Sequence, residues 1–342
     1  MASAADRSED GVMTVPVVDL STADDAPEEF AVALREAAHT SGFVYLVGHG
    51  VGVDRQAEVL STAREFFALP DADKNEISQL QSAQFRGYSR LGGELTNGQV
   101  DWREQIDIGP ERAVIDGAQG YWHLQGPNLW PTSIPRFREV FDDWSAALSA
   151  VGLRLLRHWA SSLGAEPTVF DDAFAHRPAT LMKVVRYPGT ANRSQGVGAH
   201  KDSGVLTLLL VEPDSAGLQV ELTPGQWVDV PPMDGAFIVN IGELLEVATG
   251  GYLRATRHRV QAPAPGTDRV SIPFFLNPAL DAVVPIIDLP PDLARRSRGV
   301  ETDPDNPIFA TYGENAWKSR TRAHPDVAEL HHGIPAPQRG SS

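Results

Sequence analysis

The sequence predicts a mainly β domain flanked by helices. Beyond residue 180 it consists of short apolar segments separated by turn residues, which is typical of a β-sandwich, jelly roll or barrel. Earlier segments have the 3.6-residue apolar spacing of helices. We find no linker in the 342 residues and expect one domain over 13–326, with its catalytic β core at about 180–280. The polar ends, 1–12 and 327–342, are expected to be flexible tails.

The N-terminal half is expected to provide strands and long amphipathic helices. Apolar runs predict strands at 15–20 and 43–47, and apolar faces predict helices at 26–39, 53–68 and 135–163. The stretch 71–130 has no long periodic segment, and loops of this length in compact domains are often functional.

The C-terminal half is expected to form the β core. The apolar run preceding Pro188-Gly189 predicts a strand, and the Thr223–Gln226 segment is a hairpin signal between two further strands. The predicted strands are 181–187, 205–212, 217–222, 227–230, 236–241, 256–261 and 269–276.

Composition excludes several classes of function. The formal net charge is −16, which disfavours a general binder of nucleic acid or anionic membrane. The sequence has no cysteine, so a metal must be held by nitrogen and oxygen ligands. No apolar run approaches the roughly 20 residues of a spanning helix. We therefore expect a cytoplasmic protein that is a monomer or a weak homo-oligomer.

A candidate metal site is formed by His200 and Asp202, two residues apart in Gly-Ala-His-Lys-Asp-Ser-Gly, and by His258. Residues i and i+2 of an extended chain point to the same side, here at the mouth of strand 205–212. Two imidazoles and one carboxylate can hold one face of an Fe(II) ion and leave positions for O2 and substrates. The alternative is a surface ion pair plus a strand histidine. A second His-x-Asp, His324-Pro325-Asp326, lies in a polar terminal segment and is a weaker candidate.

Arg269 and Ser271 have the same i, i+2 spacing on the next predicted strand. A guanidinium binds a carboxylate bidentately, and a serine hydroxyl adds one more hydrogen bond. The alternative is an exposed strand arginine. The apolar residues that follow favour an inward position.

Together these motifs resemble the isopenicillin N synthase-like iron(II)/2-oxoglutarate-dependent dioxygenases. The resemblance extends over most of the chain, roughly 14–325, because the motifs occur in the family's order. They are Val15–Leu20, Ser41–Val51, Phe66–Pro70, Arg86–Tyr88, Gly126–Pro131, Arg186–Pro188, Gly198–Gly204, Gly217–Gln219, Val239–Gly242, His258–Val260 and Arg269–Ser271.

The resemblance implies a double-stranded β-helix, or jelly roll, buttressed by helices, with catalytic iron ligands at His200, Asp202 and His258. It implies 2-oxoglutarate as co-substrate and O2 as oxidant, with ascorbate as a further reductant in some members. The co-substrate would be held by Arg269, Ser271 and Tyr187, with Asn240 beside the metal. The default reaction is hydroxylation of a C–H bond with release of succinate and CO2. The alternative within the family is a 2-oxoglutarate-independent oxidase that performs cyclisation or desaturation.

The small-molecule substrate is less constrained. The family builds its substrate pocket from the 80–110 region, which makes Arg86, Tyr88 and Glu104 candidate contacts. Arg186 stands where many plant relatives have a tyrosine, and Phe274 is a further candidate. A glutamate facing the site would suit an amino acid or another amine-bearing metabolite. The alternatives are a solvated charge or a buried pair with Arg103 for Glu104, and a core position for Phe274. A zinc hydrolase and a non-catalytic jelly roll are the competing classes.

Overall fold

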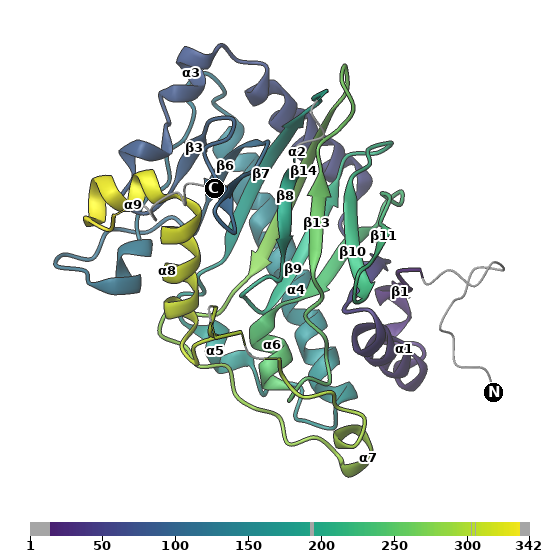
Figure 1. Cartoon of the computed structure of the whole chain (residues 1–342). Coiled ribbons are helices and arrows are strands. Elements are labelled where there is room, and N and C mark those ends of the chain that lie inside the picture. The colour runs from purple at the N-terminus through teal and green to yellow at the C-terminus, as the bar shows by residue number, and fades with distance from the viewer. Residues whose placement is uncertain (1–13, 192–194, 302, 305, 336–342) are drawn as a thin grey trace.

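The computed structural model describes residues 14–191, 195–301, 303–304 and 306–335 (Figure 1). Within the described part of 181–276, eight strands form two four-stranded layers, which confirms the predicted jelly roll. Antiparallel pairing joins neighbours within each layer. One layer contains β7 (Leu181–Pro188), β9 (Leu206–Val211), β12 (Phe237–Ile241) and β14 (Asp268–Leu276), and the other contains β8 (Gln195–His200), β10 (Leu218–Thr223), β11 (Gln226–Asp229) and β13 (His258–Gln261).

Strands from the N-terminal half extend the first layer at both edges. The large sheet has the order β1-β2-β12-β9-β14-β7-β6-β3, and the small sheet has the order β11-β10-β13-β8. The added strands are β1 (Val17–Asp19), β2 (Phe43–Val47), β3 (Gly87–Ser89) and β6 (Glu104–Ile108), while β4 (Leu95–Thr96) and β5 (Gln99–Val100) form a separate hairpin. The irregular region expected at 71–130 therefore supplies two strands of the large sheet, too short to give a periodic apolar pattern.

Long helices cover the outer face of the large sheet (Figure 1). They are α1 (Pro27–Thr40), α2 (Val53–Phe67) and α4 (Phe137–Ser162), close to the predicted helices. Shorter helices are α3 (Asp71–Asn75), α5 (Asp171–Ala175), α6 (Glu243–Ala248) and α7 (Pro291–Ala294), with 3-10 turns at Leu20–Ala23, Gln79–Gln81 and Gly120–Leu124. Among the described residues, no helix is long and apolar enough to cross a membrane.

The large sheet separates two apolar cores. Its outward side chains pack with the helices in one core, and its inward side chains meet the small sheet in a second. Successive strand residues point to opposite faces, so β12 sends Val239 into the helix core and Ile238 into the inter-sheet core. This alternation decides which side chains can reach a site between the sheets.

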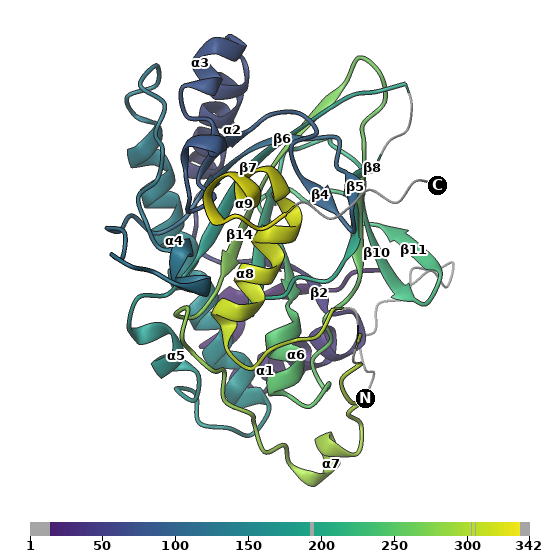
Figure 2. The same cartoon turned by 60° about the vertical axis from the view of Figure 1, so that its left-hand side comes forward.

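The C-terminal segment differs from the expected tail. Helix α8 (Tyr312–Ala323) packs against β4 and the 3-10 turn Gly120–Leu124, and helix α9 (Pro325–His332) packs against α8 and the 3-10 turn Gln79–Gln81 (Figure 2). Val327 and Ala328 are buried in the helix-side core, and Gly333 ends α9 with φ of 63°. The expected flexible tail is therefore wrong for residues 327–332. Burial of Val327 and Ala328 and hydrogen bonds from His331 and His332 to the carbonyl oxygens of Leu80 and Ala83 hold α9 in place. The expected tail at 1–12 lies outside the described residues.

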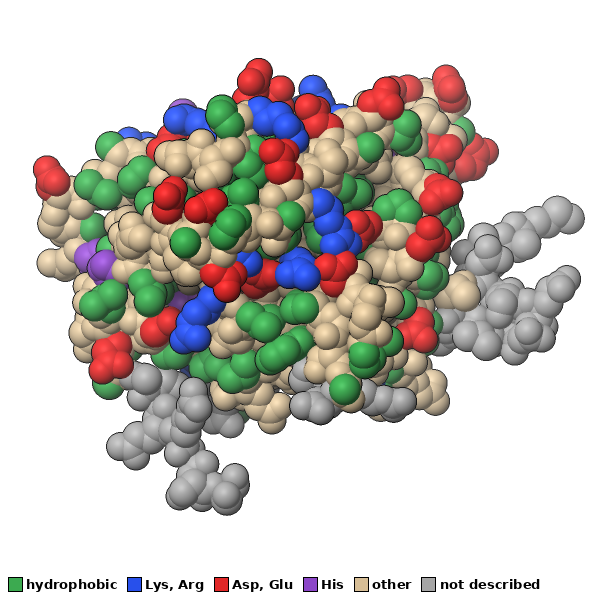
Figure 3. All heavy atoms as spheres, turned by 90° about the horizontal axis from the view of Figure 1, so that it is seen from above, with side chains coloured by type: hydrophobic (Ala, Val, Ile, Leu, Met, Phe, Trp, Pro, Cys, Tyr) green, Lys and Arg blue, Asp and Glu red, His purple; other side chains and the backbone are tan. Residues whose placement is uncertain are grey.

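Charged side chains are mixed on the face shown in Figure 3, where acidic groups are interspersed with lysine, arginine and apolar groups. The charge on this face is therefore mixed, while the formal net charge of the whole sequence is −16.

Candidate iron and co-substrate site

The three predicted metal ligands converge between the sheets. His200 is the last residue of β8, not a residue at the start of β9 as expected, and it pairs directly with His258, the first residue of β13. Asp202 follows β8, and one ligand atom from each residue lies within 4.8 Å of the others. The Asp202 Oδ1 atom is 3.5 Å from His200 Nε2 and 3.7 Å from His258 Nε2.

Hydrogen bonds on the far side of each ring orient the two imidazoles. The Nδ1 atom of His200 lies 2.8 Å from the Gly198 carbonyl oxygen, and that of His258 lies 3.1 Å from the Thr256 carbonyl oxygen. A carbonyl oxygen can only accept, so each Nδ1 carries the proton and each Nε2 offers a lone pair toward Asp202. The Phe43 ring packs edge-on against His258 at 5.3 Å between centroids and restrains that ring.

The Asp202 carboxylate is fixed by two donors from the large sheet. Its Oδ2 atom accepts from the Thr207 hydroxyl at 2.6 Å and from the Asn240 amide at 2.8 Å. Thr207 and Asn240 are cross-strand partners of β9 and β12, so both point inward at the same level. Asn240 was predicted from the family resemblance, whereas Thr207 was not. A polar residue at an inward position of an otherwise apolar strand was the signal that could have revealed it.

The protonation states of Asp202 and His258 suit a metal. Burial disfavours the charged form of Asp202, but the histidines and Asn240 outweigh it, so the pKa of Asp202 lies well below its usual value. Burial, with His200 adjacent, lowers the pKa of His258 to about 4, so that imidazole is neutral near pH 7. A carboxylate and a neutral imidazole are the forms that bind a metal. For His200, burial lowers the pKa, but the hydrogen bond and the charge of Asp202 outweigh it and raise the pKa, so metal binding would displace a proton there. Among the described residues, the second His-x-Asp forms no such convergent group.

Arg269 and Ser271 form a buried receptor for an anion. Both are about 1% exposed, and Arg269 Nη1 donates to Ser271 Oγ at 3.3 Å. The guanidinium lies 4.9 Å above the ring of Tyr187, its cross-strand partner. Arg269 Nε has no hydrogen-bond partner, and no carboxylate forms an ion pair with this guanidinium among the described residues. A buried cation without a counter-ion fits the carboxylate of a co-substrate.

Most of the predicted substrate contacts lie elsewhere. Glu104 Oε2 accepts from Tyr88 at 2.6 Å and from Lys74 at 3.0 Å, and Glu104 Oε1 pairs with Arg186 at 2.7 Å. These side chains are on the helix side of the large sheet. Glu104 is therefore not the predicted substrate contact, and the alternative of a buried pair with Arg103 does not form either, because adjacent strand residues point to opposite faces.

Phe274 and Arg86 also do not join the site. Phe274 is fully buried in the helix-side core, since it is an odd number of residues from Arg269 and Ser271 on β14. Arg86 is buried before β3 and donates to the Leu124 carbonyl oxygen at 3.1 Å. The i, i+2 spacing that joined Arg269 to Ser271 therefore argues against Phe274.

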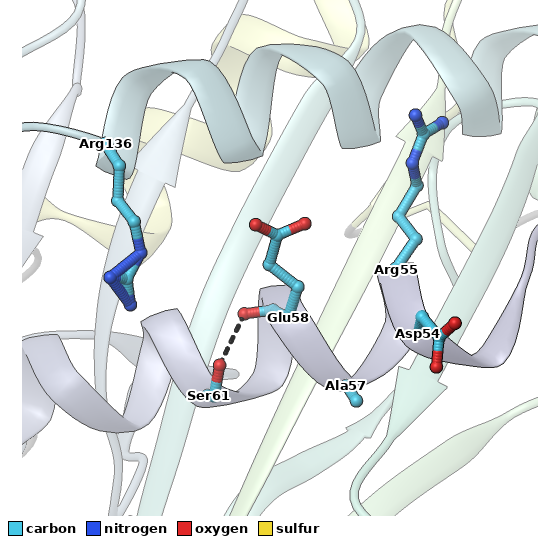
Figure 4. Close-up of a pocket in the computed structure, with 6 residues that line it drawn as sticks. All are labelled: Asp54, Arg55, Ala57, Glu58, Ser61 and Arg136. Carbon is cyan, nitrogen blue, oxygen red and sulfur yellow. Dashed lines mark hydrogen bonds between the residues drawn. The ribbon is translucent and has the colours of Figure 1, made fainter.

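An open groove on the outer surface is separate from this site. Figure 4 shows it between α2 and the residue before α4. It is lined by Asp54, Arg55, Ala57, Glu58, Ser61 and Arg136, and it contains none of the predicted site residues.

The jelly roll, the His-Asp-His group and the buried arginine define a non-haem iron oxygenase with a carboxylate co-substrate. Residues 15–133 match the family model described as the non-haem dioxygenase in morphine synthesis N-terminal, and residues 179–278 match the 2OG-Fe(II) oxygenase superfamily. The chain is 34% identical to the 2-oxoglutarate-dependent dioxygenase frbJ of Dothideomycetidae sp., over 92% of this chain and 91% of that protein. It belongs to the Fe(II)/2-oxoglutarate-dependent dioxygenases and uses Fe(II) and 2-oxoglutarate.

Further relatives show the range of the family. Homoarginine-6-hydroxylase 2-ODD-C23.1 of Arabidopsis thaliana is 32% identical over 81% of this chain and 88% of its own length. A 2OG-Fe(II) oxygenase family protein from Caulobacter crescentus superposes with a TM-score of 0.71 at 26% identity, covering 89% of this chain and 97% of that one. A full-length Neurospora crassa protein, solved in complex with alpha-KG and thymine, shares the fold with a TM-score of 0.70 at 24% identity, covering 94% and 98%.

Proposed function

We propose that this enzyme hydroxylates an unactivated C–H bond of a small molecule. The observation that carries the proposal is the pairing of a three-ligand group with a buried Arg269 whose Nε atom has no hydrogen-bond partner among the described residues. Three protein ligands leave coordination positions for a co-substrate and O2. The side chain of His200 is 31% exposed, so the group can be approached from outside.

Each residue has a separate part in this proposal. His200, Asp202 and His258 would hold Fe(II), and Arg269 with Ser271 would hold the distal carboxylate of 2-oxoglutarate. When bound, Fe(II) and 2-oxoglutarate supply the oxidant in the balanced reaction R–H + 2-oxoglutarate + O2 → R–OH + succinate + CO2. The protein orients the co-substrate and keeps water away from the reacting atoms.

For the substrate, we propose an amine-bearing amino acid as the first candidate. The support is the similarity at 32% identity to a protein named as a homoarginine hydroxylase. L-Homoarginine is therefore the first compound to test.

The test is an anaerobic titration followed by an aerobic product analysis. Fe(II) and 2-oxoglutarate should give a weak visible charge-transfer band, and a substrate should shift it. After admission of O2, hydroxylated product and succinate should form in equal amounts, with the hydroxyl oxygen derived from O2. His258→Ala should lose the band, whereas His176→Ala, which changes an exposed histidine outside the site, should retain it.

Two results would contradict the proposal. Substrate oxidation without succinate would favour the 2-oxoglutarate-independent oxidase. Equal turnover by wild type and His258→Ala would show that the three-residue group is not the metal site.

A further inference from the structure

A second group of charged and polar side chains lies on the inward face of the large sheet, next to the co-substrate residues. We call it the inner polar cluster and define it as Glu94, Arg103, Gln105, Asp107, Lys183 and Arg320. Gln105, Asp107 and Lys183 are inward positions of β6 and β7, and Gln105 is the cross-strand partner of Val185 in the inter-sheet core. All six residues are buried.

Ion pairs hold the cluster together. Lys183 Nζ is 2.6 Å from Glu94 Oε1, and Arg103 Nη2 is 3.0 Å from Glu94 Oε2 and 3.1 Å from Asp101. Arg320, from α8, lies 3.1 Å from Asp107. Helix α8, whose place in the fold Figure 2 shows, thus contributes Arg320 to the cluster.

The hydrogen bonds of the cluster are nevertheless incomplete. Glu94 Oε2, Arg103 Nε and Gln105 Oε1 are buried and have no hydrogen-bond partner. The contact between Arg103 and Glu94 Oε2 is close enough for an ion pair but lacks hydrogen-bond geometry. An unpartnered buried polar atom costs about 1–3 kcal/mol, and most such atoms in proteins are satisfied. Two acceptors and one donor left open in one cluster indicate a ligand that supplies the complementary groups.

The cluster adjoins the iron site. Arg103 precedes Glu104, which pairs with Arg186, so Arg103 stands beside Tyr187 across β6 and β7. The Arg103 guanidinium interacts electrostatically with both Tyr187 and His200. The neighbouring segment is tied to β8, because the Gly198 N–H donates to Asp101 Oδ1 at 3.2 Å and the Trp102 N–H donates to the Gln195 carbonyl oxygen at 2.9 Å.

We propose that Arg103, Glu94 and Gln105 determine specificity by binding a polar head group. The head group presents an acceptor oxygen to Arg103 and N–H donors to Glu94 and Gln105, as the amino and carboxylate groups of an amino acid or the N–H and C=O groups of a cyclic imide do. This inference rests on the proposed function and names the substrate class for the same site. A substrate with an apolar body and a lone carboxylate would leave the two acceptors unpaired, and buried unpaired groups give strong discrimination.

The test is a titration of the anaerobic enzyme loaded with Fe(II) and 2-oxoglutarate. The probes are L-homoarginine, thymine and indole-3-acetic acid, and the readout is the probe concentration at half-shift of the visible band. We expect L-homoarginine or thymine to shift the band, and the one that does so identifies the source of the head group. Indole-3-acetic acid should leave the band unchanged.

Variants of the cluster separate binding from structure. Glu94→Gln and Arg103→Lys should weaken the polar probe roughly 10- to 100-fold, the effect of losing one charge-assisted hydrogen bond, while 2-oxoglutarate binding changes by less than about threefold. Gln105→Leu removes the open Oε1 acceptor together with the Nε2 donor to Asp107 Oδ2, alters no charge, and should weaken the probe as well. Glu104→Gln makes the same change as Glu94→Gln on the opposite face of the sheet and serves as the matched control.

The inference is overturned if the cluster variants bind the probe as the Glu104→Gln control does, if only indole-3-acetic acid shifts the band, or if neither polar probe shifts it. Failure of the proposed function would be distinct, because the band with 2-oxoglutarate would then not form in the wild type. If Glu94→Gln or Arg103→Lys does not fold, the affinity of Gln105→Leu for the probe decides the test, because this variant retains every ion pair of the cluster.

Discussion

Replacing Arg269 with methionine should affect the ligand-free fold and co-substrate binding very differently. Without a ligand, the buried guanidinium has one hydrogen bond to Ser271 and a contact with the Tyr187 ring, while its Nε atom has no partner. The bond and the ring contact each contribute about 1–2 kcal/mol, and the unpaired atom costs about 1–3 kcal/mol. These contributions nearly cancel, so the free energy of unfolding should change by less than about 2 kcal/mol.

Co-substrate binding should show a large loss. Two charge-assisted hydrogen bonds to a carboxylate are worth about 3–6 kcal/mol together, so the affinity for 2-oxoglutarate should fall at least about 100-fold. At a concentration of 100 times the wild-type Kd, the ligand should stabilise the wild type by about 2.7 kcal/mol and the variant by about 0.4 kcal/mol.

The assay is denaturant unfolding with and without 2-oxoglutarate, in the presence of Fe(II) and the absence of O2. Arg186→Met is the matched control, because Arg186 forms its ion pair with Glu104 on the opposite face of the same strand pair. This control should lower stability without the ligand and leave the affinity for 2-oxoglutarate within about threefold of wild type. The reasoning is refuted if Arg269→Met costs more than about 4 kcal/mol without the ligand, or if 2-oxoglutarate stabilises both variants equally.

Three further perturbations test other parts of the structure. Thr207→Val removes a donor to Asp202 and should weaken Fe(II) binding by roughly 10- to 100-fold in an Fe(II) titration. The control Thr62→Val, which changes a buried hydroxyl without a hydrogen-bond partner, should bind Fe(II) as the wild type does. Phe274→Ala should cost about 3–5 kcal/mol of unfolding free energy but leave 2-oxoglutarate affinity unchanged, and a large affinity loss would place its ring in the site. Burial lowers the pKa of His324 from 6.5 to about 4, so this residue stabilises the fold above pH 6.5 and loses that contribution as the pH falls toward 4. Between these pH values, the free energy of unfolding of the metal-free His324→Asn variant should fall by about 3 kcal/mol less than that of the metal-free wild type. Equal falls in the two proteins would contradict the assignment.

The sequence allowed the site chemistry to be predicted because the key residues occur in short patterns on single strands. An i, i+2 pair on an extended chain shares one face whatever the rest of the fold does. For this reason Arg269 and Ser271 could be paired before their burial was known. The long helix α4 was likewise predicted within two residues at each end, since its apolar stripe repeats over many turns.

Most of the predicted substrate contacts lie away from the site, because the side on which a strand residue lies depends on strand pairing that the sequence does not show. Glu104 and Arg103 are adjacent in sequence, yet Glu104 pairs with Arg186 on the helix side while Arg103 pairs with Glu94 and Asp101, because the pairing of β6 with β7 fixes the face that Glu104 takes. The strand that contains Glu104 was not recognised within the irregular 71–130 region. Without a strand, the sequence had no way to assign a face.

The sequence by itself therefore determined the residue types available for an iron ligand set and for a carboxylate clamp. Tertiary structure alone decided their convergence, since His258 meets His200 only through the pairing of β13 with β8. It also decided that Arg269 forms no ion pair with a carboxylate of the described residues and that α8 brings Arg320 to the inner polar cluster. These are contacts between segments distant in the chain, and their burial and charge balance depend on side chains contributed by several strands and helices at once.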